Sequence, residues 1–206
     1  ATRSSRIIAR LDLSSTDEDI AVARFPYLDV EDLPEDQRHL LKRPIALHRQ
    51  LVHSPGAAKA VGAVGGWIRY DSTLDTRIRE LGILAIGWLA RAPYEWSHHV
   101  KIGQDFGVSE ADIHGLIDYL EHGRVGELDT LTLTTLDAAR ELHRGTELED
   151  ETFARLSSEL SNEHVVDLIT TISFYCCVVR VLGALQIDVE PEYEPYLQQF
   201  PLPSNG

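Results

Sequence analysis

The sequence predicts an all-α fold. Apolar residues recur at three- and four-residue steps over most of the chain after residue 34, and strand patterns are scarce. Prolines, glycines and helix-capping side chains separate these periodic stretches. The length of 206 residues is sufficient for one domain with a core of its own. We therefore expect an irregular N-terminal arm at residues 1–34 and a single helical domain at residues 35–206.

Residues 1–70 combine this arm with the first helical stretches. Polar residues 14–17 and the turn-like Phe25-Pro26-Tyr27 indicate irregular structure. The next apolar stretch predicts one helix that is bent or interrupted at Pro44, and it consists of Leu40, Leu41, Ile45, Leu47 and Leu51. Residues 56–70 are rich in Ala and Gly, which would permit close helix packing.

Two helices are predicted in the middle of the chain. An apolar stripe marks the first over residues 74–88, with Ser72 and Asp75 as its N-terminal cap. The sequence Arg91-Ala92-Pro93 ends this helix, because proline suits the first turn of the next one. That second helix is expected to end at Gly107, a residue that tolerates a left-handed cap.

Three more helices follow. Ser109 with Asp112 predicts the N-terminal cap of one helix, which His122-Gly123 stops. Two more helices are predicted at residues 129–143 and 151–160.

The last helix, at residues 162–186, is apolar almost all round. Such a helix is expected in a core or in a subunit interface, so we expect a homo-oligomer. The tail after Asp188 contains four prolines and is not expected to form a long helix.

The composition excludes several classes of partner. The chain has 19 Lys and Arg against 33 Asp and Glu, a net charge of −14, which disfavours nucleic acid and anionic membrane surfaces. The longest uncharged run, residues 168–179, is shorter than the ~18 apolar residues that a membrane span needs. The adjacent Cys176 and Cys177 provide neither a disulfide framework nor a zinc site, and no secretory signal opens the chain. We expect a cytoplasmic protein.

The candidate chemistry is densest between residues 93 and 99. Glu95 and His99 share a helix face, and a carboxylate beside an imidazole raises the histidine pKa, which favours a general acid or base. Tyr94 could donate a hydrogen bond to a developing oxyanion, and Tyr94 and Trp96 could supply pocket walls. On spacing alone, a surface ion pair between Glu95 and His99 is the favoured interpretation, because such pairs are common on helices. A metal site is disfavoured, because consecutive residues such as His98 and His99 point ~100° apart on a helix.

The central segment resembles the carboxymuconolactone decarboxylase family, also described as alkylhydroperoxidase-D-like. The resemblance covers about residues 74–120. It is carried by Arg77-x-Arg79-Glu80-Leu81-x-Ile83-Leu84, Tyr94-Glu95-Trp96-x-x-His99-x-x-Ile102 and Gly107-Val108-Ser109-x-x-x-Ile113. It implies a helical bundle, an oligomer and a pocket.

The sequence departs from the peroxidase branch of this family at the cysteines. In that branch a glutamate precedes a Cys-x-x-Cys pair, and a histidine follows the second cysteine by four residues. Glu80, Tyr94 and His99 match the glutamate, the tyrosine between the cysteines and the histidine, but Ala92 and Glu95 occupy the cysteine positions. Without a thiolate there is no peroxidatic nucleophile. The resemblance therefore implies the non-thiol branch.

Spacing alone does not bring Glu80 and His99 together. Glu80 lies ~18 Å before the break at Ala92 along a helix, and His99 lies ~10 Å after it. Their meeting is implied by the family resemblance. The alternative is pairing of Glu80 with Arg77 or Arg79, or with a Lys or Arg of a neighbouring helix.

Arg180 is the only charged residue between Asp167 and Asp188. A buried arginine needs a partner, so we expect either an ion pair with a core carboxylate or a clamp for an anionic substrate.

The sequence thus predicts a cofactor-free and metal-free enzyme that acts on a small carboxylated or lactone substrate by acid–base chemistry. Decarboxylation or lactone and enol isomerisation is the most concrete form. The predicted catalytic residues are Glu80, Tyr94, Glu95 and His99, with Trp96 and Arg180 binding substrate. The alternatives are a non-catalytic or stress-related oligomer, and a residual thiol peroxidase that uses Cys176 and Cys177.

Overall fold

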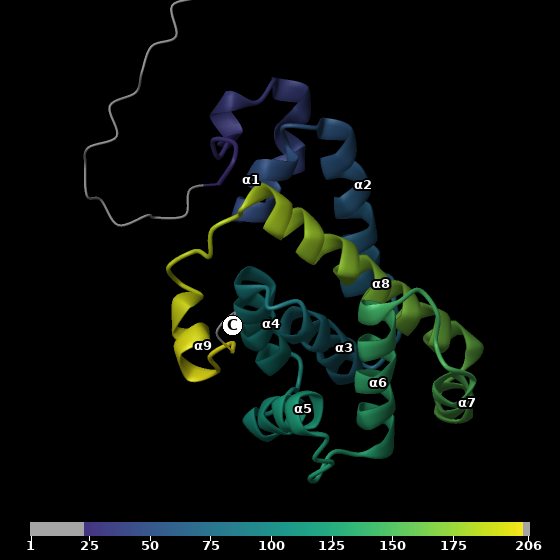
Figure 1. The fold of residues 1–206 in the computed structure, drawn as a ribbon. Helices are drawn as coiled ribbons and strands as arrows, with labels where there is room; N and C mark the ends of the chain where they lie inside the picture. Colours follow the sequence, from purple (N-terminus) through teal and green to yellow (C-terminus); the bar gives the residue numbers. More distant parts are fainter. Residues whose placement is uncertain (1–22, 204–206) are drawn as a thin grey trace, which may run out of the picture.

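The all-α prediction is confirmed by the computed structural model, which describes residues 23–203. These residues form helices and no strand (Figure 1). The central helix α3 (Thr76–Leu89) packs against α4 (Pro93–Asp105), α6 (Thr130–Arg144) and α8 (Asn162–Leu185). All residues of α3 from Ile78 to Trp88 are buried, so this helix is the centre of the core.

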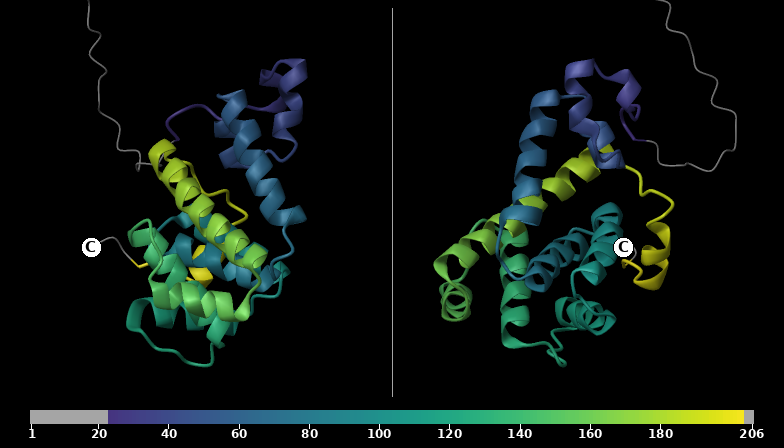
Figure 2. Two further views of the ribbon diagram at one scale, coloured as in Figure 1. Left: turned by 90° about the vertical axis from the view of Figure 1, so that its right-hand side faces the viewer. Right: turned by 180° about the vertical axis from the view of Figure 1, so that it is seen from behind.

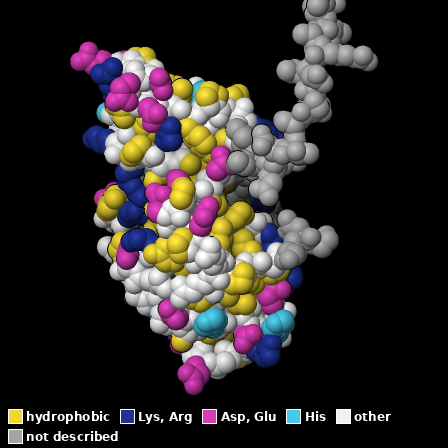
Figure 3. Space-filling model, turned by 90° about the vertical axis from the view of Figure 1, so that its left-hand side faces the viewer, with side chains coloured by type: hydrophobic (Ala, Val, Ile, Leu, Met, Phe, Trp, Pro, Cys, Tyr) yellow, Lys and Arg dark blue, Asp and Glu magenta, His cyan; other side chains and the backbone are white. Residues whose placement is uncertain are grey.

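Smaller helices cover this centre. The helix α5 (Glu110–His122) contacts α3, α7 (Asp150–Glu159) packs on α6, and the short α9 (Glu194–Gln199) lies against α4 (Figure 1). The tail thus contains a helix of only six residues, consistent with its prolines. Figure 3 shows the side of the molecule on which α9 lies, where hydrophobic side chains gather across the middle of the face.

The elements before α3 form an extension of the bundle, here called the arm helices. They are η1 (Val30–Asp32), η2 (Glu35–Leu41), α1 (Ala46–Leu51), α2 (Pro55–Gly66) and the π-helical turn η3 (Trp67–Asp71). Figure 2 shows η1, η2 and the start of α2 standing away from the other helices.

The predicted interruption at Pro44 is confirmed, but the stretch before residue 52 is two separate helices and not one. The structure has a 3₁₀ helix, η2, and a separate α-helix, α1, because Pro44 and the extended Ile45 interrupt the helical backbone. Residues 23–29 of the predicted irregular arm carry no regular structure, and the short η1 follows within it. The polar residues 14–17 lie outside the described residues.

Most helix ends coincide with the predicted signals. Ser109 and Asp112 exchange side-chain-to-backbone hydrogen bonds in a capping box at the start of α5. Gly123 ends α5 with φ of 69°, and Gly107 follows α4 with φ of 95°. The cap of α3 is Asp75, which accepts from the Ile78 amide, and not Ser72, whose hydroxyl donates to Asp167 at 2.6 Å.

The helices α3 and α4 approach each other closely at Gly87. A Cβ atom added there would lie 3.1 Å from the Trp96 backbone nitrogen and 3.2 Å from its Cα. Glycine at this position therefore permits a backbone-to-backbone contact that a side chain would obstruct.

The same two helices cross at an angle, and this crossing places the candidate site. Glu80 contacts His99, and one turn later in both helices Leu84 packs close to Gly103. If the two helices ran side by side as a simple antiparallel hairpin, a later residue of α3 would contact an earlier residue of α4. The crossing explains how Glu80 and His99 meet although their distances from the turn differ.

The helix α8 is long and apolar enough, by length and composition, to cross a membrane. Core helices of soluble proteins pass the same test, and the inner side of α8 packs in the core through residues such as Leu168 and Ile172. Its outer side carries Val166, which is 60% exposed, and Cys177. The absence of a membrane partner stays a prediction.

Candidate active site

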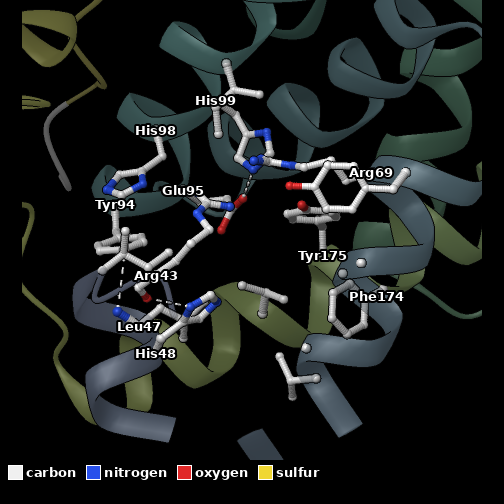
Figure 4. Close-up of a pocket in the computed structure, with 18 residues that line it drawn as sticks. Arg43, Leu47, His48, Arg69, Tyr94, Glu95, His98, His99, Phe174 and Tyr175 are labelled. Carbon is white, nitrogen blue, oxygen red and sulfur yellow. Dashed lines mark hydrogen bonds and ion pairs between the residues drawn. The ribbon is translucent and has the colours of Figure 1, made fainter. Parts of the chain in front are cut away.

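A cavity of about 210 Å³ lies between the arm helices, α4 and α8 (Figure 4). Its floor is formed by α4 through Tyr94, Glu95, His98 and His99. The arm helices and α8 supply the walls, including the glycines of α2 and Tyr175. This volume is below the ~300–1,000 Å³ of typical ligand pockets, so the cavity suits a small molecule.

A second hollow of about 420 Å³ lies at the α3–α4 turn and the C-terminal end of α8. Although it is larger, its lining is mainly aliphatic and includes none of Glu80, Glu95 and His99. We place the candidate site in the first cavity because the acid–base groups converge there.

His99 is at the centre of the site. Its Nδ1 lies 2.7 Å from Glu80 Oε2, and its Nε2 lies 3.0 Å from Glu95 Oε1. The exposed fractions of Glu80, Glu95 and His99 are 1%, 3% and 5%. The alternative of a surface ion pair between Glu95 and His99 is therefore wrong, since the imidazole bridges two buried carboxylates.

Glu80 has a second partner. Arg79 donates from Nε to Glu80 Oε1 at 3.0 Å and from a terminal nitrogen to the Ile68 carbonyl oxygen at 3.3 Å. The guanidinium also lies over the ring of Phe106. Glu80 thus makes both predicted contacts, with Arg79 and with His99, whereas Arg77 pairs with Asp112 instead.

The electrostatics of this cluster favour a charged imidazole. Burial alone would lower the pKa of His99, but Glu95 and Glu80 more than offset it and raise the pKa to about 9. Burial would raise the pKa of Glu80, but His99 and Arg79 hold it below its ordinary value. At neutral pH the site therefore contains an imidazolium and the Glu80 carboxylate.

Glu95 has unused hydrogen-bonding capacity. Its Oε1 is close to His99 Nε2, but the N–H is not aligned for a hydrogen bond, and this buried oxygen has no other partner among residues 23–203. A buried acceptor without a partner costs free energy, which a ligand donor or a bound proton could recover. Glu95 is thus the available base on the cavity floor.

Tyr94 does not offer its proton to the cavity. Its hydroxyl accepts from the Leu47 amide at 3.2 Å and donates to Glu190 at 3.3 Å. Burial, followed by the charge of Glu190, raises its pKa. The prediction that Tyr94 donates to an oxyanion is therefore wrong for this arrangement, although its ring does line the cavity.

His98 is also held by the tail. Its ring stacks between Tyr94 and Tyr193, with centroid distances of 4.0 and 3.5 Å. Its Nε2 lies 2.8 Å from Glu190 Oε2. Among the described residues there is no group of three or more His, Cys, Asp or Glu arranged to hold a metal ion.

Residues 55–120 match the sequence profile of the carboxymuconolactone decarboxylase family. The match covers 66 of the 206 residues and confirms the resemblance of this central segment to that family. No curated protein matches the chain.

Solved structures show the same fold over most of the chain. One is the alkylhydroperoxidase AhpD core of an uncharacterized peroxidase-related protein from Ralstonia eutropha JMP134, with a TM-score of 0.72, 18% identity and coverage of 85% of this chain and 95% of that one. A peroxidase-related protein from Silicibacter sp. TM1040 has a TM-score of 0.67, 19% identity and coverage of 88% and 97%.

A third solved structure is a cysteine-to-alanine variant of the debrominase Bmp8 in complex with 2,3,4-tribromopyrrole. It has a TM-score of 0.64, 15% identity and coverage of 88% and 97%. At these identities the likeness shows a shared fold alone.

Two predicted substrate-binding residues lie outside the cavity. Trp96 is fully buried and donates to the Phe200 carbonyl oxygen at 2.7 Å, so it faces the tail and packs against Trp88. Arg180 is exposed and donates to the Cys176 carbonyl oxygen of its own helix. Five residues after Tyr175, it is rotated about 140° away from the cavity, so the prediction of a buried clamp is wrong.

Tyr175, Arg43 and Arg69 are among the cavity residues that the sequence does not predict. Tyr175 meets the ring of His99 edge-on at 5.0 Å, and Arg43 and Arg69 enter from the arm helices. In the sequence Tyr175 is one more large apolar residue of α8. The arginines lie 26 positions apart with no shared motif, so nothing in the sequence links them.

Proposed function

We propose that the protein is an enzyme that transfers protons at a small carboxylated or lactone substrate, by decarboxylation or by lactone or enol isomerisation. The observation that carries this proposal is the buried imidazole of His99, held between two carboxylates on the floor of a cavity. A paired and solvent-excluded acid–base cluster of this kind is typical of general acid–base catalysis.

The geometry supports distinct roles for the two carboxylates. Glu80 has hydrogen bonds to both Arg79 and His99, so it orients the imidazole and keeps it protonated. Glu95 lines the cavity, and its Oε1 is paired with His99 without an aligned hydrogen bond, so it can remove a proton from a bound substrate. The His99 imidazolium can return a proton from its Nε2 side, which faces Glu95.

Tyr175 is a better candidate than Tyr94 for the hydrogen-bond donor. Its ring lines the cavity next to His99, and its hydroxyl forms no hydrogen bond with the described residues. Burial, followed by the charges of Glu95 and Glu80, raises its pKa, so the hydroxyl keeps its proton. It can donate to an oxyanion on a substrate carbonyl.

These groups are sufficient for either reaction. In decarboxylation the C–C bond breaks, the electron pair is delocalised onto a carbonyl oxygen near Tyr175, and His99 protonates the carbon. In isomerisation Glu95 removes a proton from one carbon and His99 delivers one to another. Proton transfer of this kind contributes on the order of 10²–10⁴-fold in rate.

The test is a comparison of the wild type with His99→Gln on a panel of small β-keto acids and unsaturated lactone carboxylates in D₂O. Proton NMR would detect deuterium incorporation as the loss of a carbon-bound proton signal, and decarboxylation as the appearance of the product signals. We expect wild-type turnover that falls by at least about 100-fold in His99→Gln. His122→Gln, at an exposed histidine, is the matched control and should retain activity. Equal turnover in His99→Gln and wild type would contradict the proposal.

A thiol-dependent peroxidase is the less favoured function. Cys176 is buried, burial raises its pKa, and neither cysteine lines the cavity. Buried thiols of raised pKa are poor nucleophiles. The double variant Cys176→Ser/Cys177→Ser should therefore keep the wild-type turnover, and any hydroperoxide reduction should be at background in both proteins. A non-catalytic oligomer would instead show no turnover of any substrate in the panel.

A further inference from the structure

Two arginines of the arm helices point into the cavity. Arg43 lies between η2 and α1, and Arg69 lies in the π-helical turn η3. Figure 4 shows their side chains extending from opposite sides toward Glu95 and His99. Neither guanidinium has an ion pair or hydrogen bond with the described residues, although other arginines such as Arg77 and Arg79 are paired.

Arg43 and Arg69 make the charge of the cavity positive. The buried cluster of Arg79, Glu80, Glu95 and His99 contains two positive and two negative groups when His99 is protonated, so it is close to neutral. Arg43 and Arg69 then leave an excess of two positive charges at the cavity. In a chain with a net charge of −14, such a local excess favours an anionic ligand.

We propose that Arg43 and Arg69 form a subsite for a carboxylate of the substrate, and that the product keeps this carboxylate. This inference rests on the proposed function and adds the residues that hold the substrate. The arginine fork matches a carboxylate in geometry, so one guanidinium can face each oxygen.

The retention of the carboxylate follows from its charge. Two guanidiniums stabilise a carboxylate in the bound ground state, and loss of CO₂ would remove the negative charge from them. Such contacts would therefore raise the barrier to loss of that group. The carboxylate bound by Arg43 and Arg69 is thus a handle, and the reacting carbon lies elsewhere, over Glu95 and His99. A decarboxylation in this cavity would require a second carboxylate on the substrate.

The local backbone explains the placement of the subsite. Helix α2 has no buried residue, and its glycines Gly62, Gly65 and Gly66 line the cavity. The π-helical turn η3 follows directly and shifts the helical register, so that Ile68 is buried while Arg69 borders the cavity.

The experiment is a calorimetric titration at pH 7 and low salt with three probes: succinate, its neutral diamide and inorganic phosphate. The proteins are the wild type, Arg43→Gln, Arg69→Gln and the double variant, with Arg144→Gln at an exposed arginine of α6 as the control. We expect succinate to bind the wild type and the control equally. Each single variant should weaken binding by about tenfold, and the double variant should lose it.

Three results would overturn the subsite. These are equal succinate affinity in the double variant, no succinate binding to the wild type, and binding of the diamide as tightly as succinate. Preference for phosphate over succinate would overturn the assignment to a carboxylate. Unchanged thermal melting of the variants, expected at these accessible positions, would show that lost binding is not lost folding.

The same titration separates this inference from the proposed function. His99→Gln should bind succinate nearly as the wild type does, because the arginines are intact, while it loses turnover. If the double arginine variant binds succinate normally and His99→Gln is inactive, the subsite is wrong and the proposed function stands. If succinate binding depends on the arginines but His99→Gln is fully active, the subsite stands and the proposed function is wrong.

Discussion

His99 Nδ1 lies 2.7 Å from Glu80 Oε2, and both side chains are almost completely shielded from solvent. The two residues come from different helices, so this contact forms only when α3 and α4 cross. Because burial by itself disfavours an imidazolium, the raised pKa of His99 depends on this contact and on Glu95. The protonation of one residue is thus linked to the folding of the whole domain.

This linkage predicts that stability decreases at alkaline pH. The pKa of His99 is about 9 in the folded protein and 6.5 for an unperturbed histidine, so between these values the folded state holds a proton that the unfolded state releases. The contribution is complete below pH 6.5 and is lost as the pH rises through about 9. The free energy of unfolding should fall by roughly 3 kcal/mol in total, measured by urea denaturation from pH ~6 to pH ~10.

Variants test whether His99 and its two carboxylates cause this decrease in the free energy of unfolding. His99→Gln should flatten the decrease, and His122→Gln should leave it unchanged. A second loss is expected at acid pH, because the pKa of Glu80 is depressed and its contribution is lost as the pH falls below its ordinary value of 4.5. An unfolding free energy that is constant across the alkaline range would show that the imidazolium is not stabilised by folding.

The second prediction compares two glycines. Gly87→Ala should destabilise the protein by about 1–3 kcal/mol, because the new methyl group would press on the backbone of Trp96, which cannot move aside as a side chain can. Gly62→Ala should stabilise it by up to about 1 kcal/mol, because its position on α2 has open space and alanine favours the helix. Thermal melting of both variants is the measurement, and equal effects of the same sign would refute the close approach at Gly87.

The third prediction concerns Glu190, which joins the C-terminal tail to the site. Its carboxylate accepts from the Ala46 amide at 2.7 Å and contacts His98 and Tyr94. Glu190→Ala should leave these groups without a partner and cost about 1–3 kcal/mol. Hydrogen exchange should become faster at the start of α1 and after α8, with Glu192→Ala as the control in the same tail. Unchanged exchange at both places in Glu190→Ala would mean that the tail is held independently of this carboxylate.

The fourth prediction is self-association. The helix α2 contains four glycines in twelve residues and no buried side chain, and a helix of this composition is only marginally stable without a partner. We expect the arm helices to pack against a second copy of the chain. Light scattering should show a dimer or larger assembly at micromolar concentration. Ala63→Glu on α2 should weaken it, while Ala111→Glu on α5 should not. A wild-type protein that is monomeric over the whole concentration range would contradict this prediction.

Local signals predict most of the fold. The caps at Ser109 and Gly123 and the break before Pro93 depend on a few neighbouring residues, so they are visible in the sequence. The separation of η2 from α1 is not visible there, because a proline such as Pro44 is compatible with a bend as well as with a break. The left-handed Arg91 at the end of α3 is also not predicted, because it is not a glycine.

The candidate site is less predictable because it depends on packing between distant segments. His99 and Glu95 share one helix, so spacing alone puts them on one face. The contact with Glu80 requires the crossing of α3 and α4, and only the family resemblance implies it. Trp96 and Arg180 show the opposite case, since both are conspicuous in the sequence but the helix rotation turns them away from the cavity.

The division of the cavity between two parts of the chain has a consequence for how this protein can diversify. The groups proposed for chemistry lie on α3, α4 and α8, whereas the two arginines lie on the peripheral segment before α3. Substitutions in that segment can alter which molecule enters while the proton-transfer apparatus stays intact. Engineering of new substrate preferences should therefore begin at positions 43 and 69, and leave the central helices untouched.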